Sequence, residues 1–353
     1  MSYLSSLRSG LLIFSLLAAL NSYATDLQHW PEKQATQLNA LIKQHANQGE
    51  FAVFDLDNTI DQNDIEEALI PWLEQRQLLT RKTMPVSLQL MPFDDRPGAP
   101  ESLFSYYHRL CEQDEMICYP WAAQIFAGFS IAELKGFVTA MMKEQKAIAV
   151  VKMHNGQPHP GLVWPPKPLP GMQELFSKLR ENGIRVYIIS AAHEELARII
   201  ASDPQYGYNV PPENVLGINT LLRDPVTGAL TTARKQIRTG VYTPGGNDRL
   251  VLTPYLIGPM TWYEGKAGTI LAYIDQWRKP ILVGGDTLGS DTFMLLNGAN
   301  VAQGGLRLWV NRSEETRSRL KLFLRKVVSR QKAAGATPDG EQNWVIVQQS
   351  ELQ

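Results

Sequence analysis

The chain has 353 residues, of which 44% are hydrophobic and 20% charged, and its formal net charge at pH 7 is −1. This length and apolar content predict a folded core with room for a second unit. The near-neutral charge argues against a nucleic-acid-binding protein, because such proteins usually carry a basic face.

An apolar stretch near the N-terminus predicts export. Arg8 precedes the apolar residues 10–20, and the small residues Ser22 and Ala24 suit a signal peptidase. The apolar stretch is too short to span a bilayer, which needs about 20 residues. We therefore predict a signal peptide over residues 1–24, an exported mature chain and no stable membrane anchor. The alternative is a slightly apolar first helix of a cytoplasmic protein.

The chain has two cysteines, Cys111 and Cys118, which lie close together in the sequence. Because an exported protein meets an oxidising compartment, a local disulfide between them is favoured. Two buried free thiols are the alternative. A metal site is disfavoured, since no histidine or further cysteine lies at zinc-like spacing.

The pattern of apolar and polar residues predicts strands that alternate with helices, interrupted by a mostly helical segment. Strands are predicted at 51–54, 184–189, 281–285, 306–310 and, as an edge strand, 344–347, with a hairpin turn at 224–228. Helices are predicted within 25–47, at 63–77, 104–110, 120–129, 131–149, 172–182, 193–201 and 266–277, from 290, and in a charged stretch ending near 332.

These elements predict an α/β fold with a Rossmann-like parallel sheet flanked by helices. Residues 25–61 and 166–353 would form this core, and residues 62–165 a mostly helical cap inserted after the first strand. The prolines of 158–170 predict a stiff exit from the cap that forms neither helix nor sheet ladder and acts as a hinge.

The first predicted strand, FAVF, is followed directly by Asp55, Asp57 and Thr59. In open α/β sheets the ligand site lies at the carboxyl ends of such strands. Two carboxylates held close together cannot both stay ionised unless a cation lies between them or one is protonated. The stretch therefore predicts a divalent-metal site, a nucleophile with an acid/base partner, or both. A strand followed by an acidic turn is the alternative.

Four further polar residues stand at predicted strand ends or helix starts: Ser190, Lys266, Asp286 and Asp291. A hydroxyl ahead of a helix N-terminus can bind phosphate oxygens beside free backbone N–H groups. Carboxylate oxygens suit Mg²⁺. Taken singly, Ser190 can be an ordinary helix N-cap and Lys266 an ordinary solvated lysine.

The segments FDLDNT, SAAHEE, EGKAGTI and GGDTLGSD resemble, in this order, the four motifs of the haloacid dehalogenase superfamily of phosphohydrolases. The resemblance implies that Asp55 attacks phosphorus to give an aspartyl-phosphate, while Asp57 protonates the leaving alcohol and then deprotonates water. It implies that Thr59 and Ser190 hold phosphoryl oxygens or neighbouring loops, and that Lys266 offsets negative charge.

The same resemblance implies a Mg²⁺ site. Its residues would be Asp55, Asp57 through the main-chain carbonyl, Asp286 and Asp291, of which Asp291 would orient Lys266 or the waters of the metal.

Within the superfamily, the chain is most similar to the bacterial exported phosphorylcholine phosphatases. The similarity rests on the four motifs, on the paired acids Glu66 and Glu67, and on the adjacent tyrosines Tyr106 and Tyr107. One departure is Gly289, where the fourth motif of that family tends to carry another aspartate. The resemblance implies a periplasmic enzyme whose partner is a small phosphorylated amino alcohol, phosphorylcholine.

A quaternary ammonium donates no conventional hydrogen bond, so aromatic faces and nearby negative charge recognise it. The candidate residues for such a cage are Glu66, Glu67, Tyr106, Tyr107 and Trp164. The alternatives are a solvated helix face for the two acids and cap core for the two tyrosines.

Other functions stay open on the sequence. The enzyme alternatives are a broad exported acid phosphatase and a phosphatase for phosphoserine or phosphoethanolamine, whose primary ammonium would prefer Glu66 or Glu67. A binding protein for a phosphorylated ligand has no need of an acid/base such as Asp57. A cap-mediated interaction protein would expose a large apolar patch. The sequence makes no prediction of oligomeric state.

Overall fold

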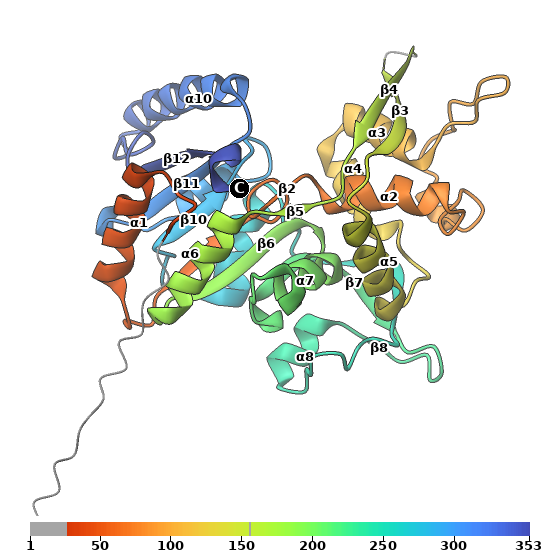
Figure 1. The fold of residues 1–353 in the computed structure, drawn as a ribbon, viewed down its shortest axis with the longest axis horizontal. Coiled ribbons are helices and arrows are strands. Elements are labelled where there is room, and N and C mark those ends of the chain that lie inside the picture. Colours follow the sequence, from red (N-terminus) through yellow and green to blue (C-terminus); the bar gives the residue numbers. More distant parts are fainter. Residues whose placement is uncertain (1–26, 155–156) are drawn as a thin grey trace, which may run out of the picture.

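The structure is a computed structural model, and it describes residues 27–154 and 157–353 (Figure 1). The predicted signal peptide, residues 1–24, lies outside the described residues. Within those two ranges, no helix is both long and apolar enough to cross a membrane.

A mostly parallel sheet of eight strands organises the chain (Figure 1). Its strands are β1 Phe51–Phe54, β6 Arg185–His193, β7 Val215–Arg223, β8 Leu230–Thr231, β9 Val251–Ile257, β10 Leu282–Gly285, β11 Leu306–Asn311 and β12 Trp344–Gln348. Their order is β12-β11-β10-β1-β6-β7-β8, and β9 also pairs with β7. The strands from β12 to β7 are parallel, whereas β8 and β9 run antiparallel to β7. The predicted α/β fold is confirmed.

The central strand β1 is apolar throughout because both of its faces are covered. Ala52 and Phe54 belong to the hydrophobic core on one face of the sheet, whereas Phe51 and Val53 belong to the core on the other. This alternation follows from the two-residue period of a strand. The first core includes apolar residues of α1 (Glu32–His45) and α6 (Pro170–Glu181), and the second those of α10 (Glu314–Ala333).

The remaining core helices are α7 Glu194–Ser202, α8 Ala233–Thr239 and α9 Glu264–Thr269. The helix predicted over 266–277 is α-helical only in α9 and continues as a wider π-helical turn over Ile270–Ile274. That turn closes when the backbone N–H of Asp275 donates to the carbonyl of Ile270. The helix predicted from residue 290 is likewise a π-helical turn, Met294–Gly298.

Between two short paired strands, β2 (Asp61–Gln62) and β5 (Lys167–Pro168), the chain forms a separate group of elements. They are α2 Ile65–Gln75, α3 Leu103–Gln113, α4 Glu115–Gln124, α5 Ile131–Glu144, β3 Ile148–His154 and β4 Gln157–Val163. We call residues 62–165 the insert; in Figure 1 most of it lies to the right of the sheet. Helix α4 contacts β6, β7 and β9, and α5 contacts α7. The assignment of the insert as a cap domain stays a prediction.

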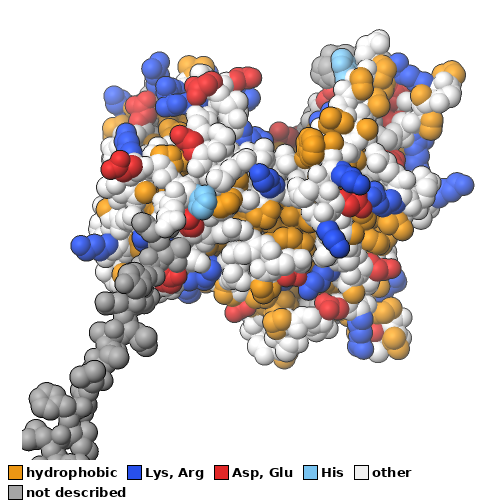
Figure 2. Space-filling model, viewed as in Figure 1, with side chains coloured by type: hydrophobic (Ala, Val, Ile, Leu, Met, Phe, Trp, Pro, Cys, Tyr) orange, Lys and Arg blue, Asp and Glu red, His pale blue; other side chains and the backbone are white. Residues whose placement is uncertain are grey.

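The β3–β4 hairpin corrects two predictions. The helix predicted over 131–149 ends at Glu144, and β3 begins four residues later. The proline-rich stretch does form a sheet ladder, because β4 pairs with β3 along its whole length. Pro158 and Pro160 are two residues apart, so both nitrogens lie on the same edge of β4, where an edge strand tolerates proline. Figure 2 shows hydrophobic side chains along this arm, where Leu162 is 62% exposed.

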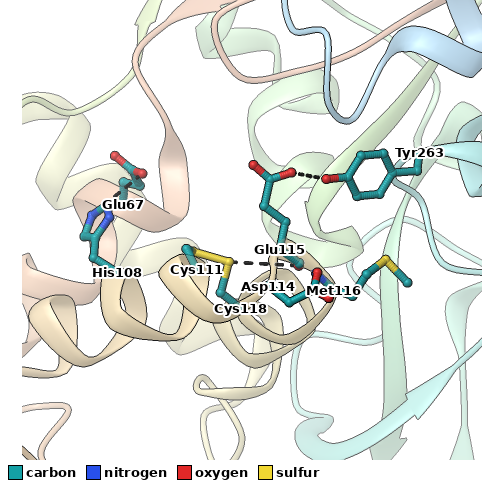
Figure 3. Close-up of a disulfide and its surroundings, with 8 residues drawn as sticks. All are labelled: Glu67, His108, Cys111, Asp114, Glu115, Met116, Cys118 and Tyr263. Atoms are coloured by element: carbon teal, nitrogen blue, oxygen red, sulfur yellow. Dashed lines mark hydrogen bonds and ion pairs between the residues drawn. A yellow bond between two sulfur atoms is a disulfide. The ribbon is translucent and has the colours of Figure 1, made fainter.

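A disulfide joins Cys111 at the end of α3 to Cys118 in α4, as predicted (Figure 3). The two helices are separated by Asp114 alone, whose side chain accepts a hydrogen bond from the backbone N–H of Met116 and so caps α4. The crosslink therefore constrains the sharp turn between α3 and α4.

We expect that removing the disulfide destabilises the insert. Replacing both Cys111 and Cys118 by alanine should lower the free energy of unfolding by about 2 kcal/mol, because closing a short loop removes entropy from the unfolded chain. Urea unfolding followed by circular dichroism measures this change. A reductant should lower the stability of the unaltered protein to the same level and leave the double variant unchanged; an equal effect of reductant on both would contradict the prediction.

Candidate active site

Three neighbouring strands bring the predicted motif residues to one edge of the sheet. Asp55 directly follows β1, Asp286 directly follows β10, and Ser190 lies in β6. These strands are parallel, and their carboxyl ends form the usual ligand site of an open α/β sheet. A cavity of about 200 Å³ lies at this edge, between the sheet and the insert.

The cavity brings together six residues predicted from the sequence and several that were not. The predicted ones are Asp55, Asp57, Glu66, Glu67, Tyr107 and Asp286. The unpredicted ones that can act chemically are Asp64, Tyr119, Ser290 and Arg312. A second cavity of about 860 Å³, between α2, α3 and the β3–β4 arm, contains none of the predicted site residues.

Lys266 of α9 is fully buried between two carboxylates. Its Nζ lies 2.5 Å from Asp55 Oδ1 and 2.7 Å from Asp291 Oδ1. Burial by itself lowers the pKa of the ammonium, but Asp291 and Asp55 outweigh it and raise the pKa above its ordinary value. Lys266 is therefore a fixed positive charge beside Asp55.

Asp291 holds both Lys266 and the loop after β10. Besides the contact of its Oδ1 with Lys266, its Oδ2 accepts hydrogen bonds from the backbone N–H groups of Asp286 and Thr287, at 3.0 Å each. Both oxygens are thus engaged by donors, which favours an orienting role for Asp291.

Asp286 is buried and lies between a hydroxyl and a guanidinium. Thr59 donates a hydrogen bond to Asp286 Oδ1 (3.1 Å), and Arg312 Nε lies 3.0 Å from Asp286 Oδ2. Burial raises the pKa of Asp286 well above its usual range, and Arg312 opposes this shift. Arg312 follows β11, the strand next to β10, so it reaches the site by the same strand-end geometry.

The acid predicted to protonate the leaving group, Asp57, lies in the loop between β1 and β2, ahead of the insert. Its Oδ1 accepts a hydrogen bond from the backbone N–H of Ile65 (2.9 Å). Burial raises the pKa of Asp57 well above its ordinary value, and the nearby negative charges of Asp64 and Asp61 raise it further. A raised pKa is what a carboxylic acid needs to act as a proton donor near neutral pH.

The pKa of the predicted nucleophile, Asp55, is also shifted. Burial and Asp291 raise the pKa of Asp55 to about 7, while Lys266 opposes this shift. A nucleophilic carboxylate must be ionised, so any cation added beside Asp55 favours its reactive form.

The two acids of α2 line the side of the cavity formed by the insert. Asp64 caps α2 by accepting from the backbone N–H groups of Glu66 and Glu67. Glu66 Oε1 accepts from the backbone N–H of His193 (2.9 Å), which ties α2 to the core. Burial and Asp64 raise the pKa of Glu67 to about 7, and burial raises that of Glu66 well above its usual range. A cation bound here would lower both pKa values.

Two tyrosines, Tyr107 of α3 and Tyr119 of α4, face the same side of the cavity. Tyr107 stacks on Trp121, with ring centroids 6.2 Å apart. Burial, Glu67 and Asp64 raise the pKa of Tyr107 well above its ordinary value, so the phenol stays neutral. Aromatic rings next to acids are suited to bind a cation.

The structure does not bring the other two predicted cage residues, Tyr106 and Trp164, to the cavity. Tyr106 is fully buried within the insert, where its hydroxyl donates to the carbonyl of Met91 (3.0 Å) and accepts from its N–H. Trp164 follows the β3–β4 arm and is 47% exposed. Tyr106 is therefore insert core, which was the alternative interpretation of the sequence.

The serine predicted from the second motif, Ser190, is fully buried, and its Oγ accepts from the backbone N–H of Ala192 (3.0 Å). Ala192 itself lines the cavity. Another serine, Ser290, lies in the cavity wall with no hydrogen-bond partner for its Oγ among the described residues. A buried hydroxyl without a partner is suited to bind a ligand oxygen.

Three buried carboxylates form a candidate metal site. Asp55, Asp286 and Asp291 each place an oxygen within 4.8 Å of the others. Hard oxygen ligands of this kind can hold a divalent cation. The side chain of Asp57 does not belong to this group, and a contribution through its main-chain carbonyl stays a prediction.

Arg312 and Tyr119 were missed for different reasons. Arg312 follows a strand that was predicted, and the strand-end argument applied to Asp286 would also have found it. Nothing in the local sequence distinguishes Tyr119 from a core residue of α4.

We expect replacement of Lys266 by methionine to destabilise the protein in a pH-dependent way. Without the ammonium, Asp55 and Asp291 are left as unpaired buried carboxylates, which should cost about 3–5 kcal/mol near pH 8. The pKa of Asp55, already about 7, would rise further in the variant. At pH 5 Asp55 is protonated in the unaltered protein and in Lys266→Met alike, so the difference in stability between the two should be smaller there. Unfolding by urea at the two pH values measures the difference. The exposed Lys279→Met is the matched control; an equal loss at both pH values would contradict the expectation.

Comparison with known proteins places the chain in a family, although no family model matches it. It is 50% identical to a phosphorylcholine phosphatase of Pseudomonas aeruginosa, over 98% of this chain and 99% of that protein. A solved structure of a conserved protein of unknown function from Anaerococcus prevotii shares the fold, with a TM-score of 0.56 and 21% identity over 84% of this chain and 90% of that one. The chain therefore belongs to the phosphorylcholine phosphatase family.

Proposed function

We propose that this protein is an exported, Mg²⁺-dependent phosphomonoester hydrolase whose substrate is phosphorylcholine. One observation carries the proposal: one small cavity joins Asp55, which is paired with the Lys266 ammonium, to a wall of acids and tyrosines. Asp55, Lys266 and Arg312 suit a phosphoryl group, and Glu67 and Tyr107 suit a quaternary ammonium. The 50% identical relative is a phosphorylcholine phosphatase, which supports the same substrate.

Asp55 acts as the nucleophile. Its carboxylate attacks phosphorus to give an aspartyl-phosphate, which splits one difficult hydrolysis into two easier steps. Lys266 lies 2.5 Å from Asp55 and favours its ionised form. The ammonium also offsets the repulsion between the Asp55 carboxylate and the negative charge of an approaching phosphate.

Asp57 acts as the acid and then as the base. In the first step it protonates the alcohol that leaves phosphorus, and in the second it accepts a proton from the attacking water. The raised pKa of Asp57 supports this role, because the group must carry its proton when the ester bond breaks.

The residues suited to hold Mg²⁺ are Asp55, Asp286 and the main-chain carbonyl of Asp57, with Asp291 orienting Lys266 beside them. The buried carboxylate cluster supports this assignment. When bound, Mg²⁺ neutralises charge on the phosphoryl oxygens and on Asp55. Thr59 orients Asp286, and Ser290, Arg312 and the backbone around Ser190 are suited to the remaining phosphoryl oxygens.

The insert selects the alcohol. A trimethylammonium group would lie against Tyr107 and Tyr119, with Glu67 nearby to balance its charge. The cavity, at about 200 Å³, is smaller than typical drug-binding pockets of about 300–1,000 Å³, which supports a small metabolite as the substrate.

A periplasmic location fits the sequence and the disulfide. The predicted signal peptide would direct the chain out of the cytoplasm, and a disulfide between Cys111 and Cys118 suits an oxidising compartment. The predicted absence of a membrane anchor belongs to the same proposal.

Substrate preference and nucleophile identity can be tested together. We expect phosphorylcholine to give the highest kcat/KM among phosphorylcholine, phosphoethanolamine, phosphoserine and p-nitrophenyl phosphate, measured as phosphate release with Mg²⁺. Asp55→Asn should lower kcat by at least about 10³-fold, because no other carboxylate can replace the nucleophile, and chelation of divalent cations should abolish turnover. Equal turnover of all four esters would favour the broad phosphatase, and tight binding without turnover the binding protein.

The cation wall can be tested by a matched pair of aromatic substitutions. Tyr107→Leu should raise KM for phosphorylcholine roughly ten-fold through the loss of a cation–π contact, with little change for p-nitrophenyl phosphate. Trp164→Leu, outside the cavity, should leave both values unchanged. Steady-state kinetics on both substrates measures this, and the opposite ranking of the two variants would refute the proposed wall.

A further inference from the structure

The insert meets the core at a second place, beside the cavity just described. Glu115, the first residue of α4, accepts a hydrogen bond at Oε2 from the hydroxyl of Tyr263 (Figure 3). The two residues are 148 positions apart in the sequence. Glu115 belongs to the insert and Tyr263 to the core, so this contact bridges the two parts.

The bridge is part of a larger contact between the start of α4 and residues 262–263. Trp262 Nε1 points at the sulfur of Met116, 3.1 Å away, and the ring of Tyr119 packs edge-on against Trp262 with centroids 6.2 Å apart. Trp262 is fully buried. Three side chains of α4 therefore hold this short segment of the core.

The segment leads directly into the helix that carries Lys266. Tyr263 precedes α9, and its carbonyl accepts the backbone N–H of Lys266 (3.2 Å). Tyr263 has φ +50° and ψ −131°, a conformation that costs a residue with a side chain about 1–3 kcal/mol and persists only when its surroundings hold it. The contacts from α4 supply such surroundings.

The bridge also touches the loop that carries Asp286 and Asp291. A Cβ atom at Gly289 would lie 3.2 Å from Glu115 Oε2 and 3.9 Å from a ring carbon of Tyr263. Glycine at this position therefore leaves room for the carboxylate of Glu115. The bridge thus abuts both segments that position the ammonium of Lys266.

We propose that Glu115 is a positioning residue for the phosphatase reaction: through Tyr263 it fixes Lys266 against Asp55. Glu115 does not line the cavity at Asp55, so it acts through Tyr263 and α9. The Cys111–Cys118 disulfide holds the first turns of α4 in place for this contact. This inference rests on the proposed function in one respect: the phosphatase reaction is the readout for the position of Lys266.

The experiment measures kcat and KM of Glu115→Ala, Glu115→Gln, Tyr263→Phe and the double variant Glu115→Ala/Tyr263→Phe. Both phosphorylcholine and p-nitrophenyl phosphate are used, because the second carries no ammonium. We expect Glu115→Ala and Tyr263→Phe each to lower kcat roughly ten-fold on both substrates, a loss of about 1.4 kcal/mol of transition-state stabilisation, with KM changed less than about two-fold. Glu115→Gln keeps an accepting oxygen and should lose less. The double variant should be no slower than either single one, because both changes remove the same bridge.

The matched controls are Glu264→Gln and Tyr255→Phe, which change an exposed glutamate and an exposed tyrosine nearby in the core. Both should keep the kcat of the unaltered protein. Thermal unfolding of every variant verifies that it is folded at the assay temperature.

Three results would overturn the proposal. They are an unchanged kcat in folded Glu115→Ala and Tyr263→Phe, additive losses in the double variant, and a rise in KM for phosphorylcholine alone, which would make Glu115 part of the ammonium wall. Failure of the proposed substrate is a separate result: the unaltered protein would then hydrolyse p-nitrophenyl phosphate but not phosphorylcholine, and the variants would still be compared on p-nitrophenyl phosphate.

Discussion

The buried ammonium of Lys266 is the interaction on which the site depends. Removing a charge from water is costly unless partners compensate it, and Lys266 is compensated on both sides, by Asp55 and Asp291. Asp291 in turn holds the backbone of the loop that carries Asp286. Because these groups come from β1, α9 and the loop after β10, one ion-pair network aligns three separate segments at the carboxyl edge of the sheet.

The core and the insert contribute different chemistry to one cavity. The core supplies the groups that we propose to meet a phosphoryl group, among them Asp55 and Arg312, whereas the insert supplies acids and tyrosines, among them Glu67 and Tyr107. Burial raises the pKa values of the acids on both sides, so without a bound cation these acids are neutralised by protons instead. A divalent metal at one end and an ammonium at the other would relieve this electrostatic cost, which couples cation binding to proton release.

The α3 helix explains why adjacent residues separate into different roles. Successive residues of an α-helix point about 100° apart, so Tyr107 faces the cavity while Tyr106 packs in the insert and bonds to Met91. The pair Tyr106-Tyr107 predicted an aromatic wall, but only the helix orientation decides which ring belongs to it. The proline-rich arm shows the opposite case, where a local rule against strands failed because the prolines of β4 lie on one edge of the strand.

By itself the sequence determined the parallel strands β1, β6, β10, β11 and β12, the order of the motifs and the residues at the strand ends, because a buried parallel strand and the polar turn after it are local patterns. Asp55, Asp57 and Asp286 were identified in this way, whereas Lys266, which lies in a helix, was identified by the resemblance of its motif. Only the tertiary structure decided that Tyr119 and Ser290 join the cavity and that Glu115 contacts Tyr263. These residues meet through the order of strands in the sheet and the packing of the insert on it. A contact between two segments that are distant in the sequence produces no periodic pattern or motif in the sequence of either segment.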